Sequence, residues 1–300
     1  MTRSIWLALG AIALASCGQD VGTPTDRPLV VASFYPHYEF ARQVAGNRAE
    51  VVSLVPTGVE PHDWEPSPQD VVRIEHARVF VYNGAGYERW IDRLAGGIRA
   101  TGAVVVRATE GIDLLPADRR GERTAVSDPH VWLDPLLAQH EVEAIRAALG
   151  KADPAHETEY ADHARAFTAR LAGLDEAYAK GLAQCLRRDL IVSHDAFGYL
   201  ARRYRLLVVS LMGLAPDAEP SPAELASIVR LAQRRGVKYV FFETLVSPKL
   251  ADTLAHEVGA RTLVLNPIEG RTHEEAAAGM DYVELMEANL KNLRIALECR

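Results

Sequence analysis

The sequence predicts an α/β fold with two parallel-sheet lobes joined by one long helix. Short, continuous apolar runs alternate with helical patterns, which is typical of βα units whose parallel strands are buried on both faces. A long helical segment divides these runs into four before it and four after it. The expected strands are Leu29–Ser33, Val51–Val55, Val79–Tyr82, Val104–Val106, Leu190–Ser193, Leu206–Ser210, Tyr239–Phe242 and Thr262–Leu265.

Capping residues mark the helix starts. At five expected helix starts a Ser or Asp stands before Pro, a pattern that favours the first turn of a helix. The dipeptides are Ser67-Pro68, Asp134-Pro135, Asp153-Pro154, Ser221-Pro222 and Ser247-Pro248.

The connecting helix is expected over Pro154 to Gln184. This stretch has no internal Pro, and its Leu and Tyr residues fall on one face at helical spacing. A helix of about 30 residues is about 45 Å long, the length of a whole lobe. Two shorter helices that break near Gly173 are the alternative. A single helix restricts hinge motion between lobes.

The N-terminus resembles an export signal. Arg3 precedes an apolar run, Ile5 to Ala15, that is too short to anchor a protein in a bilayer. The string Leu14-Ala15-Ser16-Cys17 is similar to a bacterial lipobox, in which the Cys is lipidated, although Cys17 can also be incidental to a plain secretory signal. We therefore divide the chain into a signal peptide (1–16), a lipidated tether (17–27), an N-terminal lobe (28–152), the connecting helix (153–185) and a C-terminal lobe (186–300).

Composition excludes some partners and leaves the cysteines open. The chain has 300 residues and a formal net charge of -7, which argues against nucleic acid as a partner. Cys185 and Cys299 remain after export, and an oxidising compartment allows them to form a disulfide. Free buried thiols are equally consistent with the sequence. No CxxC motif indicates a cysteine metal site.

Polar side chains stand where the predicted strands end. His194 directly follows the strand Leu190–Ser193, while His62 and His130 lie in loops of the first half. Ligands of open parallel sheets bind beyond the carboxyl ends of the strands. Three imidazoles and one oxygen form a good tetrahedral zinc site, although imidazole also suits copper, nickel or iron. The candidates for the fourth ligand are Glu243, Asn266 and Glu269.

Three strings resemble the motif regions of a known family. Gly58–Pro68, Asp128–Pro135 and Ser193–Tyr199 look like those of the zinc- and manganese-binding ABC-transporter lipoproteins, the cluster 9 solute-binding family. Ser33–Pro36 and the segment from Tyr282 to Leu297 also resemble that family.

The resemblance implies a metal buried between two lobes, with ligands at His62, His130 and His194. A His at the third position is similar to the zinc binders, where manganese binders have Glu. The fourth position often holds Asp in the family, but Asn266 stands here, which leaves Glu269, Glu243 or water as the fourth ligand. The His-rich loop of many zinc members is absent, because Pro116 to Ser127 is short and has no His.

We therefore expect a protein that is not an enzyme and that captures Zn²⁺ for the membrane permease of an ABC transporter. It would be a monomer, located outside the cytoplasm in the periplasm or at the cell surface, and attached to the membrane by its lipid. A manganese- or iron-binding member (Mn²⁺ or Fe²⁺) is the main alternative. A zinc hydrolase, an adhesin and a sugar- or amino-acid-binding protein are others, but no HExxH motif, repeat or exposed aromatic stripe supports them.

Overall fold

The structure is a computed structural model that describes residues 27–119, 122–216 and 220–300. The predicted signal peptide, Cys17 and all of the tether except residue 27 lie outside the described residues. Among the helices of the described ranges, none is long and apolar enough to cross a membrane.

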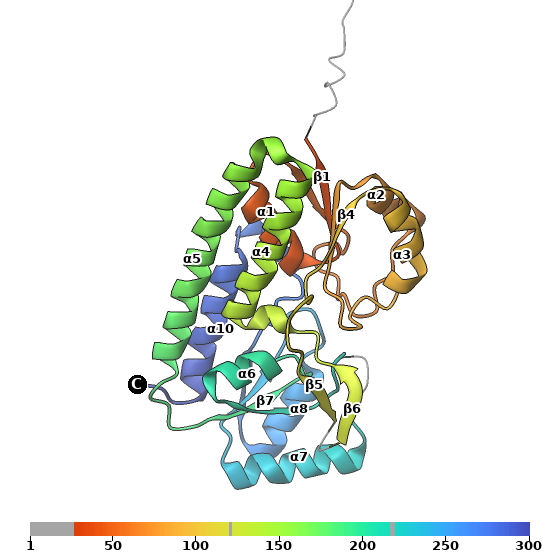
Figure 1. The fold of residues 1–300 in the computed structure, drawn as a ribbon. Coiled ribbons are helices and arrows are strands. Elements are labelled where there is room, and N and C mark those ends of the chain that lie inside the picture. The colour runs from red at the N-terminus through yellow and green to blue at the C-terminus, as the bar shows by residue number, and fades with distance from the viewer. Residues whose placement is uncertain (1–26, 120–121, 217–219) are drawn as a thin grey trace, which may run out of the picture.

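Two four-stranded sheets form the centres of the two lobes (Figure 1). Every strand pair in them is parallel. The strand orders are β2-β1-β3-β4 and β10-β9-β7-β8, which confirms the predicted fold class. The strands are β1 (Leu29–Ala32), β2 (Glu50–Ser53), β3 (Val79–Tyr82), β4 (Val104–Arg107), β7 (Asp189–Val192), β8 (Leu207–Ser210), β9 (Tyr239–Phe242) and β10 (Arg261–Val264).

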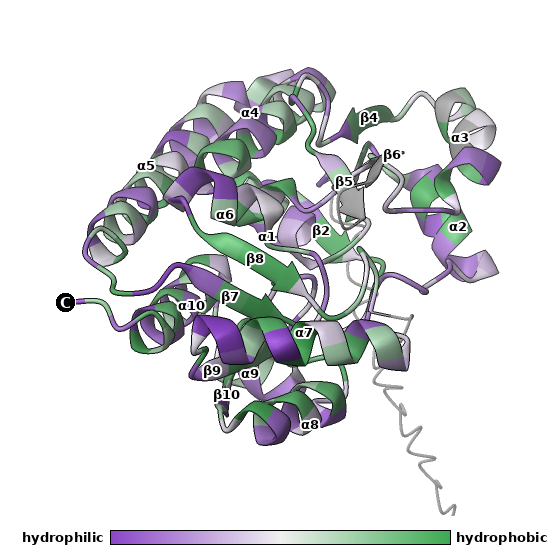
Figure 2. Cartoon of the chain, turned by 90° about the horizontal axis from the view of Figure 1, so that it is seen from below, coloured by the Kyte–Doolittle hydropathy of each residue, from purple (hydrophilic) through white to green (hydrophobic). Residues whose placement is uncertain are grey.

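Helices cover both sheets. In Figure 2 strands β7 and β8 are coloured as hydrophobic, whereas the helices around them also carry hydrophilic residues. Ser67, Ser221 and Thr272 each complete a capping box, and Asp134 caps its helix through the Leu136 N–H, as residues of these types do. The helices besides the connecting one are α1 (Tyr35–Ala45), α2 (Pro68–His76), α3 (Ile91–Ala100), α4 (Pro135–Ala152), α6 (Gly198–Tyr204), α7 (Pro222–Arg235), α8 (Lys249–Val258), α9 (His273–Ala277) and α10 (Tyr282–Ala296).

The connecting helix is a single helix that is shorter than expected at both ends. A 3₁₀ turn, η2 (Pro154–His156), precedes α5 (Glu157–Gly181), whose 25 residues correspond to about 37 Å. The helix does not break at Gly173. Its buried face contacts both lobes, because the Phe167 ring lies 5.8 Å from Phe40 of α1 and the Tyr178 ring stacks on Tyr204 of α6 at 5.0 Å.

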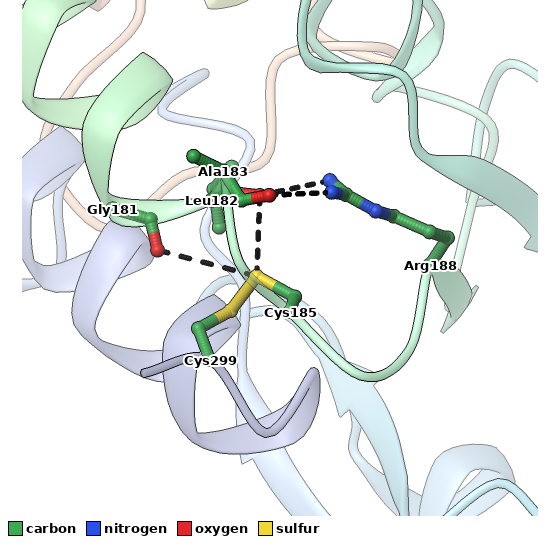
Figure 3. Close-up of a disulfide and its surroundings, with 6 residues drawn as sticks. All are labelled: Gly181, Leu182, Ala183, Cys185, Arg188 and Cys299. Atoms are coloured by element: carbon green, nitrogen blue, oxygen red, sulfur yellow. Dashed lines mark hydrogen bonds between the residues drawn. A yellow bond between two sulfur atoms is a disulfide. The ribbon is translucent and has the colours of Figure 1, made fainter.

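A disulfide joins Cys185, just beyond α5, to Cys299 at the end of the chain (Figure 3). Beside it, Arg188 donates to the carbonyl oxygens of Leu182 and Ala183 at 2.9 and 3.1 Å. A cation at a helix C-terminus satisfies carbonyls that have no partner within the helix. The bridge therefore ties the end of α10 to the end of the connecting helix.

A short hairpin was not predicted. Strands β5 (Pro116–Arg119) and β6 (Glu122–Ser127) pair antiparallel, in the segment that the sequence indicated only as a short loop. The segment is rich in charged residues and lacks the apolar alternation that indicates a strand. The hairpin leads directly into the loop that carries His130.

Candidate metal centre

Four side chains from both lobes meet at one point. His62 lies in the loop after β2, and His130 lies between β6 and the 3₁₀ turn η1 (Val131–Leu133). His194 follows β7 directly, and Glu269 lies in the loop after β10. Their nitrogen and oxygen atoms lie within 4.8 Å of one another. The three histidines singled out in the sequence are thus brought together, with one of the three candidate oxygen donors.

The three rings direct Nε2 toward the same oxygen. Glu269 Oε1 lies 2.9 Å from His62, 3.1 Å from His130 and 3.4 Å from His194. Donors held at about 2.0–2.1 Å by a tetrahedral ion are about 3.3 Å apart. The most distant pair therefore has to approach by at most about 1.5 Å to coordinate zinc.

The centre is buried. The side chains of His130 and His194 have no exposed surface, Glu269 is 3% exposed and His62 is 7% exposed. The Tyr87 ring packs on His62 at 4.8 Å, and Trp132 packs on His130 at 5.2 Å. Low dielectric surroundings strengthen the interaction of a cation with these donors.

Asn266 is occupied elsewhere. Its Oδ1 accepts the N–H of Ile268 at 2.7 Å, and its Nδ2 donates to Glu275 at 3.1 Å. The tight turn gives Ile268 a φ of 59°, a left-handed conformation that a β-branched residue rarely adopts. This turn directs the next residue, Glu269, into the group with the three histidines, whereas both ends of the Asn266 side chain are bonded outside that group.

Glu243 and Asp128 lie behind two of the rings. Glu243 Oε1 is 2.8 Å from His194 Nδ1 and accepts the backbone N–H of His194 at 3.1 Å. Asp128 Oδ1 makes the same pair of contacts to His130, at 2.8 and 2.9 Å. A carboxylate only accepts, so Asp128 keeps the proton on His130 Nδ1 and directs the Nε2 lone pair of that ring toward a metal. Glu243 places a negative charge beside the His194 ring.

Asp128 was missed as a functional residue, although it lies within the quoted string Asp128–Pro135. An acid two residues before a candidate ligand was the available signal. Glu60 accepts the backbone N–H of His62 at 3.1 Å through one of its oxygens. Burial raises the pKa of Glu60, although His62 opposes the shift.

Without a metal, the carboxylates and imidazoles shift one another's protonation. Burial lowers the pKa of His194, but Glu243 and Glu269 outweigh it and hold that pKa well above its usual range. Burial likewise opposes the raised pKa of His130, which Asp128 and Glu269 cause. Burial raises the pKa of Glu269, but His62, His194 and His130 outweigh it and hold that pKa well below its usual range. The metal-free centre thus holds protons that a cation would have to displace.

Comparison with known proteins gives a consistent family. Residues 30–296 match a family model described as zinc-uptake complex component A, periplasmic. The chain is 39% identical over 311 residues to the high-affinity zinc uptake system protein ZnuA of Bacillus subtilis, covering 97% of this chain and 98% of that protein. It is also 39% identical over 274 residues to the zinc-binding lipoprotein AdcA of Streptococcus pneumoniae, with 88% of this chain matched, but spans only 55% of AdcA.

Solved structures share the fold. The Zn(II)-bound ZnuA-like domain of AdcA matches with a TM-score of 0.80 and 40% identity, covering 91% of this chain and 99% of that domain. The laminin-binding protein Lmb of Streptococcus agalactiae, described as bifunctional with adhesin and metal transporting activity, matches with a TM-score of 0.83 and 32% identity. That match covers 90% of this chain and 99% of Lmb.

Proposed function

Because the chain belongs to the family of periplasmic zinc-uptake components, we propose that it captures Zn²⁺ outside the cytoplasm and delivers it to the permease of an ABC transporter. One observation carries the proposal. Three imidazole nitrogens converge on one carboxylate oxygen in a buried space between the lobes. This donor set has the number and type of ligands that a closed tetrahedral zinc site requires.

The donor set favours zinc over manganese or iron. Three neutral imidazoles and one carboxylate suit zinc, whereas Mn²⁺ prefers more oxygen ligands and a higher coordination number. We propose His62, His130, His194 and Glu269 as the ligands. The general order of affinities of divalent metals would also allow Cu²⁺. Selectivity for zinc over copper must therefore come from the coordination geometry and from which metal is available.

The same geometry argues against the hydrolase alternative. A catalytic zinc keeps one position open for water or substrate. Glu269 can take the fourth position, because its Oε1 lies 2.9–3.4 Å from all three Nε2 atoms in a buried centre. A binding role fits these residues better than turnover.

Location and partners follow from the family and the N-terminal sequence. We propose that residues 1–16 are removed and that a lipid on Cys17 holds the protein at the outer side of a membrane, next to the permease. A monomer suffices, since one chain supplies all four donors.

Calorimetry tests the metal site. The metal-free protein is titrated with zinc, manganese, iron and copper, and each site variant (His62→Ala, His130→Ala, His194→Ala and Glu269→Gln) is titrated with zinc. Each variant should weaken zinc binding at least tenfold, about 1.4 kcal/mol. His256→Ala is the control, because His256 is exposed on α8. Zinc affinity that stays unchanged in the site variants would refute the site, and tight manganese binding without zinc binding would refute the metal.

Uptake and lipidation assays test the rest of the proposal. Cells that lack the protein should recover zinc uptake with the wild-type chain but not with His194→Ala. Cys17→Ser should abolish incorporation of labelled fatty acid and release the protein from membranes. Continued membrane attachment of Cys17→Ser would contradict the lipid anchor.

A further inference from the structure

The hydroxyl of Tyr199 links α6 to a backbone position two residues before His130. Tyr199 lies on α6, five residues after His194, and is fully buried. Its hydroxyl donates to the carbonyl oxygen of Asp128 at 2.8 Å and accepts the N–H of Leu115 at 2.9 Å. Leu115 and Asp128 precede the connecting helix α5 in the chain, whereas Tyr199 follows it.

Those two backbone groups flank the hairpin β5–β6. Pro116 and Ser127 are its outermost pair, and the Asp128 N–H donates directly to the Leu115 carbonyl oxygen at 2.8 Å. In an antiparallel pair of this kind, the Leu115 N–H would normally donate directly to the Asp128 carbonyl oxygen. The Tyr199 hydroxyl is inserted into this second bond and bridges it.

Asp128 is the carboxylate that holds the His130 ring and its backbone N–H. The position of its backbone therefore depends on a hydroxyl that is carried by α6, the helix that follows His194. We propose that Tyr199 is a positioning residue that couples the placement of His130 to the segment carrying His194. The inference rests on the proposed function, because it concerns the same metal site.

Gly198 supports the same coupling independently. A Cβ at this position would lie 2.5 Å from Asp128 Oδ2. The first residue of α6 thus packs directly on the carboxylate that orients His130. A methyl group there would have to displace the carboxylate or the helix.

The first test is Tyr199→Phe, with zinc dissociation followed by stopped flow after addition of a chelator. Without the bridging hydroxyl, the Leu115 N–H can donate directly to the Asp128 carbonyl oxygen. The two chain segments at the base of the hairpin then move closer together, and His130 moves with them. If the variant loses the contribution of one buried hydrogen bond of ordinary strength, its zinc dissociation should be about three- to tenfold faster than that of the wild type. Tyr178→Phe is the matched control, because its hydroxyl is also buried and donates to a backbone carbonyl, that of Met286, in the connecting helix region.

The second variant is Gly198→Ala, which should raise the zinc dissociation rate as well. Gly173→Ala is its control, since a Cβ there meets no atom within 4 Å. NMR gives a readout that a purely structural effect would not reproduce. The chemical shifts of the His130 ring nitrogens should change in Tyr199→Phe and Gly198→Ala but not in the two controls. A through-hydrogen-bond coupling from the Leu115 nitrogen to the Asp128 carbonyl carbon should appear only in Tyr199→Phe.

The outcomes separate the two proposals. The positioning role is wrong if Tyr199→Phe and Gly198→Ala keep the wild-type zinc dissociation rate and the wild-type chemical shifts of His130. This holds even when His194→Ala abolishes zinc binding. If His194→Ala itself binds zinc normally, the proposed site fails first. If Tyr199→Phe does not fold, Gly198→Ala decides alone. In the wild-type protein, a coupling from the Leu115 nitrogen to the Asp128 carbonyl carbon would overturn the inference.

Discussion

Replacing Asp128 with Asn should weaken zinc binding in a way that depends on pH. Asp128 Oδ1 lies 2.8 Å from His130 Nδ1 and 2.9 Å from its backbone nitrogen. Asn can keep an oxygen at this place but not the charge that makes the imidazole a stronger donor. Loss of such a partner typically costs 10–100-fold in metal affinity, about 1.4–2.8 kcal/mol.

The pH dependence follows from the pKa of His130. Burial lowers that pKa, but Asp128 first and Glu269 second outweigh it and raise it. The wild-type protein must release this more firmly held proton before it binds zinc, whereas Asp128→Asn releases it more easily. Above both pKa values the full affinity difference remains. As the pH falls through the wild-type pKa, proton competition weakens the wild type more, so the difference narrows.

The assay is competition with a chromophoric zinc chelator from pH 5.5 to 8.5, using metal-free wild-type protein and Asp128→Asn. The circular dichroism spectrum of the variant should match the wild type, which checks folding. A loss of affinity that is constant over this range, or that grows toward low pH, would refute the proton-competition argument. No loss at any pH would refute the role of Asp128 in holding His130.

Three further predictions concern protons, the turn and the disulfide. Zinc binding should release protons at pH 7, because raised histidine pKa values keep them in the metal-free centre. Calorimetry in buffers of different ionisation enthalpy counts the released protons. The same binding enthalpy in every buffer would contradict this prediction. Asn266→Ala removes the acceptor of the Ile268 N–H and should weaken zinc binding about tenfold. Asn266→Asp keeps an acceptor and should bind zinc within about threefold of wild type. Equal zinc affinities of the two variants would exclude the turn as the cause. The double variant Cys185→Ser, Cys299→Ser removes a disulfide between residues 114 positions apart. It should lower the free energy of unfolding, measured by urea titration, by about 2–5 kcal/mol. An unchanged unfolding midpoint would show that the disulfide does not contribute to stability.

The fold was predictable because its strands are short apolar runs buried on both faces. Continuous β-branched segments such as Val79–Tyr82 give the same signal wherever a parallel sheet is covered by helices. The hairpin β5–β6 gave no such signal. Its base is held by tertiary contacts through Tyr199, and tertiary contacts are not visible in local pattern or propensity.

The ligand histidines were accessible to sequence reasoning, but the oxygen donor was not. His194 follows a buried strand, so its place at the sheet edge is fixed by topology. Glu269 depends on a turn in which Asn266 holds a β-branched residue at a φ of 59°. No local preference of Ile268 predicts that conformation. The sequence therefore left Asn266, Glu243, Glu269 and water open as the fourth ligand, and among these side chains only Glu269 shares a group with the three histidines in the structure.

The contacts between the lobes also constrain how a metal is exchanged. Phe40, Phe167 and Tyr282 form one continuous aromatic core across the first lobe, α5 and α10. A swing of one lobe about a hinge would have to separate these buried rings, at a cost that grows with the apolar area exposed. Shifts of the loops that carry His62 and His194 leave the contacts among these three rings in place. Loop movement around a fixed pair of lobes is therefore the less costly route for zinc to enter and leave.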